Sequence, residues 1–356
     1  MINSAFKLIP TFFFKDIQLQ TTMKSKQTVI TIFLTLFFVT GTASLYAQTN
    51  SSENHSNPSY NIRGFVQQQF VDDRTPGVPA GFSIYRARIG IAGNITDQLS
   101  INLIGGFVEP PQRTPRLVNA SIDYRIHDLL TIRAGQFLLP FGLEGPEVIT
   151  FNPAIERSMA TRRLNTFNMF RDIGVQASGS RSRFNYAVAI INGTGANQTA
   201  QMNPKDLIGR AGIQLTHNLE IGISGHSGKY LPAGNPDSEQ SRNRAGLDIH
   251  YDGNPVFFRG ELITRKDNLP GSESVTMNGG YLLAGLHVTD RIETIARYEY
   301  FTPNNDLDDN RLTGYTIGAN YYLTGRNRFS INYEIRDNEQ NSEFGNLLTF
   351  QLQVVL

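Results

Sequence analysis

The chain has 356 residues, and its 32 Lys and Arg against 31 Asp and Glu give a formal net charge of +1. The chain therefore lacks the excess of basic residues that is expected of a nucleic-acid-binding protein. The absence of cysteine excludes a disulfide framework and a thiolate metal site. A chain of this length can form two ordinary domains or one large all-β domain.

The first predicted element in chain order is a secretory signal peptide at 23–47. Lys24 and Lys26 precede an apolar run near 29–39, and small residues lead to Ala47. This run is shorter than the roughly 20 residues of a membrane-spanning helix, so a signal peptide is favoured over a signal anchor. The preceding residues, 1–22, are interpreted as an over-extended start, and 48–59 as an N-terminal linker.

The predicted mature chain uses arginine for nearly all of its cations. Four lysines and one aspartate precede residue 48, which leaves 28 basic and 30 acidic residues and a net charge of −2. Of the 28 basic residues, 25 are arginine, and the three lysines are Lys205, Lys229 and Lys266. Arginine presents a planar fork of donors that suits phosphate and carboxylate groups, whereas lysine is a mobile point charge.

From residue 60 onward, apolar and polar residues alternate with the period of a β-strand. In 83–93, for example, Tyr85, Ala87 and Ile89 share one face while Arg86 and Arg88 share the other. Sixteen such strands are predicted near 60–71, 82–93, 99–108, 117–126, 130–139, 171–179, 183–192, 205–216, 219–228, 242–251, 255–265, 278–288, 291–301, 312–323, 327–336 and 346–356.

The connections between these strands alternate strictly between short and long. Short turns such as NITDQ, DGN and TGRN follow the even strands, and longer excursions such as VDDRTPGVP and PNNDLDDN follow the odd ones. A soluble β-sandwich has no reason to separate its loops by length, whereas an outer-membrane barrel has an even strand number, short periplasmic turns and longer outer loops. The sequence therefore predicts an all-β fold, a 16-stranded antiparallel transmembrane β-barrel over 60–356, with apolar faces toward lipid and polar faces toward water.

The longest excursion, 140–170, follows the fifth strand and is therefore the third outer loop. Its length allows it to fold back into the channel and narrow it. It carries three arginines, and a fourth begins the next strand: Arg157, Arg162, Arg163 and Arg171. Three glutamates share the loop, Glu144, Glu147 and Glu156, and could offset part of its positive field.

Charged residues on the polar strand faces are predicted to line the lumen. The cations are Arg86, Arg88, Arg125, Arg133, Arg210, Arg242, Arg244, Arg259, Arg297, Arg328 and Arg336, and the anions are Asp123, Asp172, Asp248, Glu261, Glu293, Glu299 and Glu334. The cations are in moderate excess, and channel selectivity follows the summed field and the groups at the narrowest point. The alternative is that these charges only solvate a wet wall and pair across neighbouring strands.

Catalytic motifs are absent from the sequence. The six histidines, His55, His127, His217, His226, His250 and His287, have no metal-ligand spacing, and neither a GxSxG elbow nor a P-loop occurs. We expect no enzymatic activity, no cofactor and no metal site.

Three segments around the third loop resemble the phosphate-selective porin O and P family of Gram-negative outer membranes. They are GQFLLPFGLE at 135–144, ITFNPAIERSMATRRL at 149–164 and FRDIGVQASG at 170–179. RARIGIAG, YAVAIINGTG and KDLIGRAGIQL are similar to other recurrent strands of the family, in the same order. The resemblance implies a usually trimeric, sixteen-stranded porin in the outer membrane, whose third loop folds inward and whose arginine-lined pore favours anions such as phosphate or polyphosphate.

The sequence thus favours a passive channel for small anions, with outer-membrane lipid and a homotrimer as partners and no nucleic acid. The candidate anion-binding and pore-lining residues are Arg86, Arg88, Arg125, Arg133, Arg157, Arg162, Arg163, Arg171 and Arg210. Three alternatives stay open: a general or sugar-admitting porin, a non-conducting barrel that binds a partner at its surface, and a soluble secreted β-protein.

Overall fold

The computed structural model describes residues 58–74, 77–165, 167–200, 205–230, 240–268, 273–338 and 345–356. The predicted over-extended start and signal peptide, and the predicted linker up to residue 57, lie outside this part of the chain. Within it, no helix is long and apolar enough to cross a membrane.

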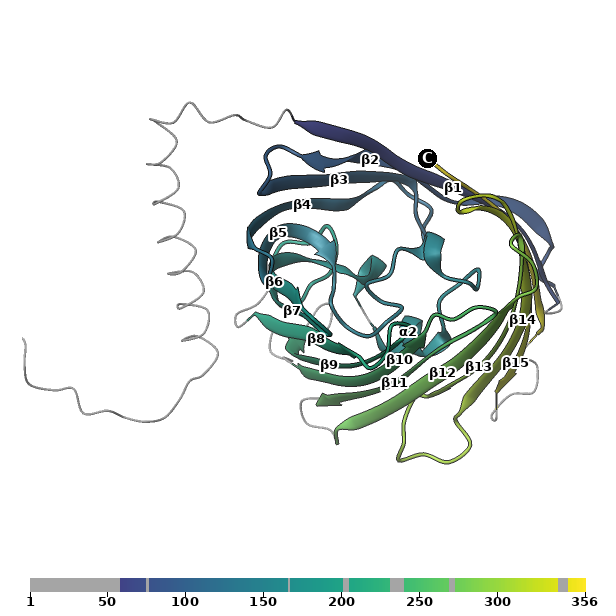
Figure 1. Cartoon of the computed structure of the whole chain (residues 1–356). Helices are drawn as coiled ribbons and strands as arrows, with labels where there is room; N and C mark the ends of the chain where they lie inside the picture. The colour runs from purple at the N-terminus through teal and green to yellow at the C-terminus, as the bar shows by residue number, and fades with distance from the viewer. Residues whose placement is uncertain are drawn as a thin grey trace, which may run out of the picture. The chain divides into compact units, whose positions relative to one another are not determined.

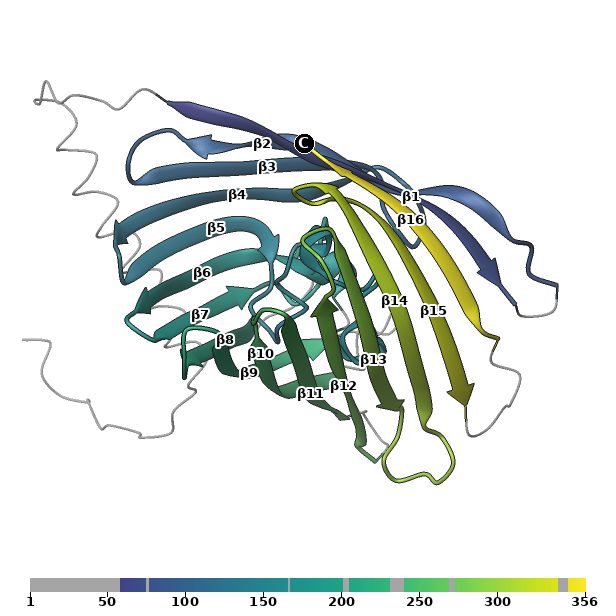
Figure 2. The same ribbon diagram turned by 45° about the vertical axis from the view of Figure 1, so that its right-hand side comes forward.

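Sixteen antiparallel strands form a closed barrel in which each strand pairs with its neighbours in sequence and β1 pairs with β16 (Figures 1 and 2). Closure leaves no open sheet edge, as the hydrocarbon core of a bilayer requires. The strands are β1 (Ser59–Asp73), β2 (Gly81–Asn94), β3 (Leu99–Val108), β4 (Arg116–His127), β5 (Leu130–Leu138), β6 (Arg171–Arg181), β7 (Phe184–Ile191), β8 (Asp206–Gln214), β9 (Leu219–Tyr230), β10 (Gln240–Tyr251), β11 (Val256–Asn268), β12 (Val275–His287), β13 (Ile292–Thr302), β14 (Leu312–Thr324), β15 (Asn327–Asn338) and β16 (Leu347–Val355).

The predicted fold class is confirmed. Both ends of every predicted strand lie within three residues of the ends of that strand in the structure. Alternation of burial explains this agreement. Along β11, Glu261 is 2% exposed and Ile263 is 4% exposed, whereas Leu262 between them is 54% exposed. Apolar side chains thus face outward, as they do in barrels that contact lipid.

Three of the short turns share one local structure, built around a threonine. The turns ITDQL, LTHNL and VTDRI place Thr96, Thr216 and Thr289 at the same position. In each turn the threonine Oγ1 accepts the backbone N–H of the residue three positions later, at 3.0–3.1 Å. Such hydroxyl–backbone bonds favour turns over continued strands, so a short sequence pattern ends one strand and starts the next.

One β-bulge changes the facing predicted for β2. Gln67 pairs with Arg86, but the next residue, Gln68, pairs with Ile84, so Tyr85 is an extra residue between two ladder positions. A bulge turns the following side chains to the opposite face. Tyr85 was expected on the lipid face with Ala87; it instead lines the same interior cavity as Arg86.

The segment between β5 and β6, residues 139–170, lies inside the ring of strands (Figure 1). We call it the inner loop. It contains two short 3₁₀ turns, η1 (Ile149–Phe151) and η2 (Asn168–Phe170), and one helix, α2 (Met159–Leu164). The predicted inward folding of the third outer loop is therefore confirmed.

An apolar cluster fixes the inner loop to the barrel wall. Loop residues Leu139, Phe141, Met159 and Leu164 are buried together with inward-facing wall residues. These wall residues are Ala189, Ile191, Ile208, Ile263, Phe301 and Leu312. The inner wall is therefore not uniformly polar: apolar side chains occupy it where the loop packs.

Candidate functional site

Wall carboxylates bind the backbone N–H groups of the inner loop on one side of the barrel. Glu261 of β11 accepts the N–H groups of Leu143 and Glu144, the latter at 3.1 Å, and also accepts the Thr161 hydroxyl at 2.9 Å. Glu299 of β13 accepts the Met159 N–H at 2.7 Å. These carboxylates satisfy backbone donors that would otherwise be buried without partners.

Wall donors bind the carbonyl groups of the same loop. Arg328 donates to the Asn152 carbonyl at 2.6 Å and Asn320 donates to the Pro153 carbonyl at 2.9 Å. Arg297 donates to the Glu156 carbonyl at 2.8 Å, and Arg244 donates to the Leu164 carbonyl at 3.3 Å. Several arginines that the alternation assigns to the lumen therefore hold the loop in place.

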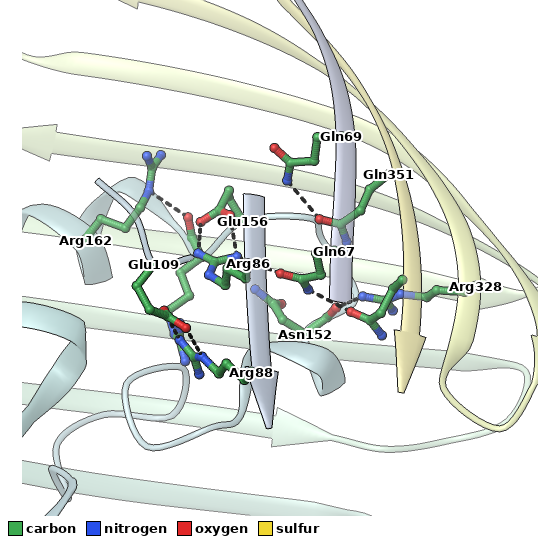
Figure 3. A network of polar contacts seen from close by, with 12 residues as sticks. Gln67, Gln69, Arg86, Arg88, Glu109, Asn152, Glu156, Arg162, Arg328 and Gln351 are labelled. Atoms are coloured by element: carbon green, nitrogen blue, oxygen red, sulfur yellow. Dashed lines mark hydrogen bonds and ion pairs between the residues drawn. The ribbon is translucent and has the colours of Figure 1, made fainter. Parts of the chain in front are cut away.

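On the opposite side, the loop reaches β2 through a forked ion pair (Figure 3). Arg86 donates to both carboxylate oxygens of Glu156, at 3.0 and 3.2 Å, and to Gln67 at 3.0 Å. Two positions along the strand, Arg88 forms a second fork with Glu109, at 2.6 Å to each oxygen. Both forks have the bidentate geometry in which arginine binds carboxylates most strongly.

The environment of the loop shifts the pKa of two of its own charged groups. Burial by itself would raise the pKa of Glu156, but the adjacent Arg86 charge and its hydrogen bonds outweigh burial, so the pKa lies below the ordinary glutamate value. Burial, followed by repulsion from Arg86, lowers the pKa of Arg157 to about 10. Both groups remain charged at neutral pH, and the Arg157 guanidinium is held among like charges.

A cavity of about 600 Å³ lies between β2, the segment after β3 and the inner loop. Six of the nine predicted site residues line it: Arg86, Arg88, Arg157, Arg162, Arg163 and Arg171. Three glutamates also line it: Glu109, Glu147 and Glu156. Glu144, which was expected to share this field, is fully buried and accepts the Ser158 N–H at 2.8 Å.

The arginines of this cavity differ in their partners. Arg86 and Arg88 are paired with carboxylates, and Glu147 pairs with Arg259 of β11 at 2.9 Å. In the part of the chain that the structure describes, the other four cavity arginines form no ion pair. Arg157 donates to the carbonyls of Glu144, at 2.8 Å, and Glu147. Arg171 donates to the Asn119 side chain and to the Met169 carbonyl, both at 2.7 Å. Arg162 and Arg163, in the last turn of α2, are exposed, and Arg162 donates to the Arg157 carbonyl at 3.0 Å.

The other three predicted site residues lie away from this cavity. Arg125 is exposed and donates to the Asp97 carbonyl of the β2–β3 turn at 2.7 Å. Arg133 pairs with Asp123 at 2.7 Å. Arg210 pairs with Glu220 at 2.8 Å and with Asp248 at 3.0 Å. The structure thus brings six of the nine arginines together, and a role in binding stays a prediction for all of them.

Aromatic residues are the part of the cavity that the sequence did not indicate. Phe167 and Phe170 of the inner loop line it together with Tyr85. The Arg157 guanidinium lies 4.5 Å from the centre of the Phe170 ring. The proximity of FNMFR to Arg171 in the sequence is the one signal that could have pointed to the two phenylalanines, whereas the placement of Tyr85 depends on the bulge.

Metal-binding groups are absent from the described residues: nowhere do three or more His, Cys, Asp or Glu side chains come together in a way that could hold an ion. The chemistry available in the cavity is therefore that of forked N–H donors, carboxylates and aromatic rings.

Comparison with known proteins gives a family match. A family model described as phosphate-selective porin O and P matches residues 58–264 and 237–356. No similar sequence was found among curated proteins.

Solved porins share the fold at low sequence identity. An anion-selective porin from Comamonas acidovorans is 14% identical with a TM-score of 0.68, over 84% of this chain and 100% of that one. The trimer form of OmpT from Vibrio cholerae is 11% identical with a TM-score of 0.66, over 85% and 100%. OmpF from Salmonella typhi, solved with daunomycin, is 11% identical with a TM-score of 0.62, over 83% and 97%.

Proposed function

The chain belongs to the phosphate-selective porin O and P family and is an outer-membrane channel of a Gram-negative bacterium, and we propose that this channel passively admits small anions, with phosphate or polyphosphate among them. The family and the fold point to a channel rather than to an enzyme. The proposal concerns which solutes the channel favours and which residues select them.

The observation that carries the proposal is the group of four cavity arginines without a carboxylate partner. Arg162 and Arg163 are exposed and line the cavity, whereas Arg157 and Arg171 are buried, with their guanidinium groups held by carbonyl and amide oxygens. An anion here would meet several charge-assisted donors at once. Because each contact is individually replaceable by water, the ion can also leave, as conduction requires.

A matched pair of variants tests the proposal in a planar bilayer with a potassium chloride gradient. Arg162→Gln/Arg163→Gln should move the reversal potential away from the chloride equilibrium value and weaken current block by phosphate. Arg181→Gln/Arg183→Gln removes the same charge from two exposed arginines at the β6–β7 turn and should leave both readouts unchanged. Arg157 is left intact because its side chain is buried and donates to two loop carbonyls, those of Glu144 and Glu147.

Two outcomes would contradict the proposal. A reversal potential near zero in the unaltered protein would mean a general porin, in which the cavity glutamates offset the arginines. Equal shifts in both double variants would mean that overall charge, rather than the cavity, sets the preference.

A non-conducting barrel is the second candidate, because the inner loop is bonded to opposite sides of the wall. It contacts Arg86 of β2, Ser224 of β9, Glu261 of β11 and Gln353 of β16. A folded protein that inserts into bilayers without giving current steps would establish this function in place of transport.

We further propose that the protein acts as a homotrimer embedded in outer-membrane lipid. The support is the family membership and the trimer form described for the Vibrio cholerae relative. Mass measurement of the protein in mild detergent tests it: a mass of three chains is expected, and a single-chain mass at all protein concentrations would refute it.

A further inference from the structure

The arginine-bearing cavity is also lined by apolar side chains. Among the arginines lie Tyr85 of β2, Pro110 and Pro111 of the segment after β3, and Ile149, Phe167 and Phe170 of the inner loop. An inorganic anion such as phosphate binds through polar donors and does not need apolar side chains around it. A site that combines charged donors with aromatic faces is typical of organic ligands.

Phe170 is the aromatic residue placed most specifically. Met169 and Phe170 both have left-handed backbone conformations, with φ values of 56° and 57°. Two such residues in succession are unfavourable without glycine and cluster at binding sites and ligand clamps. The conformation is held by the Phe170 N–H donating to the Phe167 carbonyl and by Arg171 donating to the Met169 carbonyl. The chain therefore fixes an aromatic ring next to two cavity arginines.

The size of the cavity agrees with this chemistry. Its volume of about 600 Å³ lies inside the range of roughly 300–1,000 Å³ that is usual for small-molecule sites. A phosphate ion has five heavy atoms and would leave most of this space unfilled. Guanidinium groups stack on planar rings, as Arg157 does on Phe170 at 4.5 Å and Arg86 does on Tyr85 at 4.4 Å. The exposed Arg162 and Arg163 can stack on the ring of a ligand in the same way.

We propose that the preferred solutes of this cavity are organic anions in which a planar apolar ring carries a phosphate or carboxylate group. The inference rests on the proposed anion-selective function and names its substrate class. The oxyanion binds the arginines that lack carboxylate partners, and the ring packs on Phe170 and Tyr85.

The test compares phenyl phosphate with inorganic phosphate as blockers of the chloride current through the intact protein. At about pH 8.5 both carry close to two negative charges, so the ring is the main difference between them. Phenyl phosphate should reach half-block at a concentration roughly five- to tenfold lower. Benzyl alcohol, which has a ring but no charge, should not block in the same range.

Single substitutions then locate the ring. Phe170→Leu and Tyr85→Leu should each reduce the ratio between the two half-blocking concentrations. Phe151→Leu is the matched control, because Phe151 lies in the same loop under the Arg326 guanidinium, 4.2 Å from the ring centre, but outside the cavity. It should leave the ratio unchanged.

The outcomes separate this inference from the function on which it rests. Three outcomes would overturn the ring proposal while anion selectivity stands. The two phosphates could have equal half-blocking concentrations in the unaltered protein, benzyl alcohol could block the current, or neither Phe170→Leu nor Tyr85→Leu could alter the ratio. A reversal potential near zero with no block by either phosphate would overturn both.

Discussion

Arg86 and Glu156 join the wall of the barrel to its inner loop through an ion pair that consists of two hydrogen bonds. Glu156 retains its charge because Arg86 compensates for burial, which places its pKa below the ordinary value. A carboxyl whose pKa is lowered on folding stabilises the folded state above its unfolded pKa and loses that contribution as the pH falls through the folded one.

The Arg86–Glu156 pair should therefore stabilise the protein at pH 7 and at pH 5 alike. Glu156→Gln should lower the free energy of unfolding by about 1–3 kcal/mol at both values. The difference between the two proteins should shrink only below about pH 4, because a free glutamate titrates near 4.3. Guanidinium unfolding in lipid vesicles at several pH values measures it. A difference that already disappears at pH 5 would contradict the lowered pKa.

Among elements, α2 depends on the absence of a side chain in the strand beneath it. A Cβ atom at Gly279 of β12 would lie 3.0 Å from both the Ala160 Cβ and the Leu164 Cδ1, and 3.1 Å from the Tyr300 carbonyl oxygen. A side chain at position 279 would therefore push against the side chains of α2 that pack on this strand.

Gly279→Val should displace α2 from the wall. Overpacking of this kind costs about 1–3 kcal/mol, and the loop that narrows the barrel should then occupy several positions. We expect a lower unfolding midpoint and noisier single-channel currents. Gly225→Val in β9 is the control, because no atom lies within 4 Å of a Cβ built there. Equal effects of the two substitutions would mean that α2 does not rest on Gly279.

For the whole molecule, selectivity should follow the summed field of the cavity rather than one contact. Carboxylates neutralise Arg86 and Arg88, while four further arginines add positive charge to the same space. Fields between exposed charges act over the screening length, which is about 10 Å at 0.1 M salt and about 3 Å at 1 M.

Anion preference should therefore weaken with salt. At a fixed concentration ratio across the bilayer, the reversal potential should move toward zero as the mean potassium chloride concentration rises from about 0.1 M to about 1 M. A potential that does not change over this range would show that close hydrogen bonds, which salt screens little, select the ion.

Much of the barrel could be predicted from the sequence because its determinants are local. A residue such as Leu262 between Glu261 and Ile263 shows its facing through the period of two, since bilayer and lumen impose opposite polarity on alternate residues. Threonine turns such as VTDRI end strands through bonds within five residues. Loop length then distinguished the end of the barrel with short turns from the end with long loops. Because long loops follow the odd strands, the segment 140–170 after the fifth strand is the third outer loop.

What the cavity contains was decided only by the tertiary structure. Arg157 and Arg162 are neighbours on the same loop and both donate to loop carbonyls, but Arg157 is buried and Arg162 is exposed, which only the folded loop determines. Tyr85 joined the cavity through a bulge that depends on the partner strand. The sequence by itself thus determined the strands, the closure and the charge available. The tertiary structure decided which cavity arginines stay without carboxylates, because the partners Glu109 and Glu156 come from the segment after β3 and from the inner loop, and only folding brings them to Arg88 and Arg86.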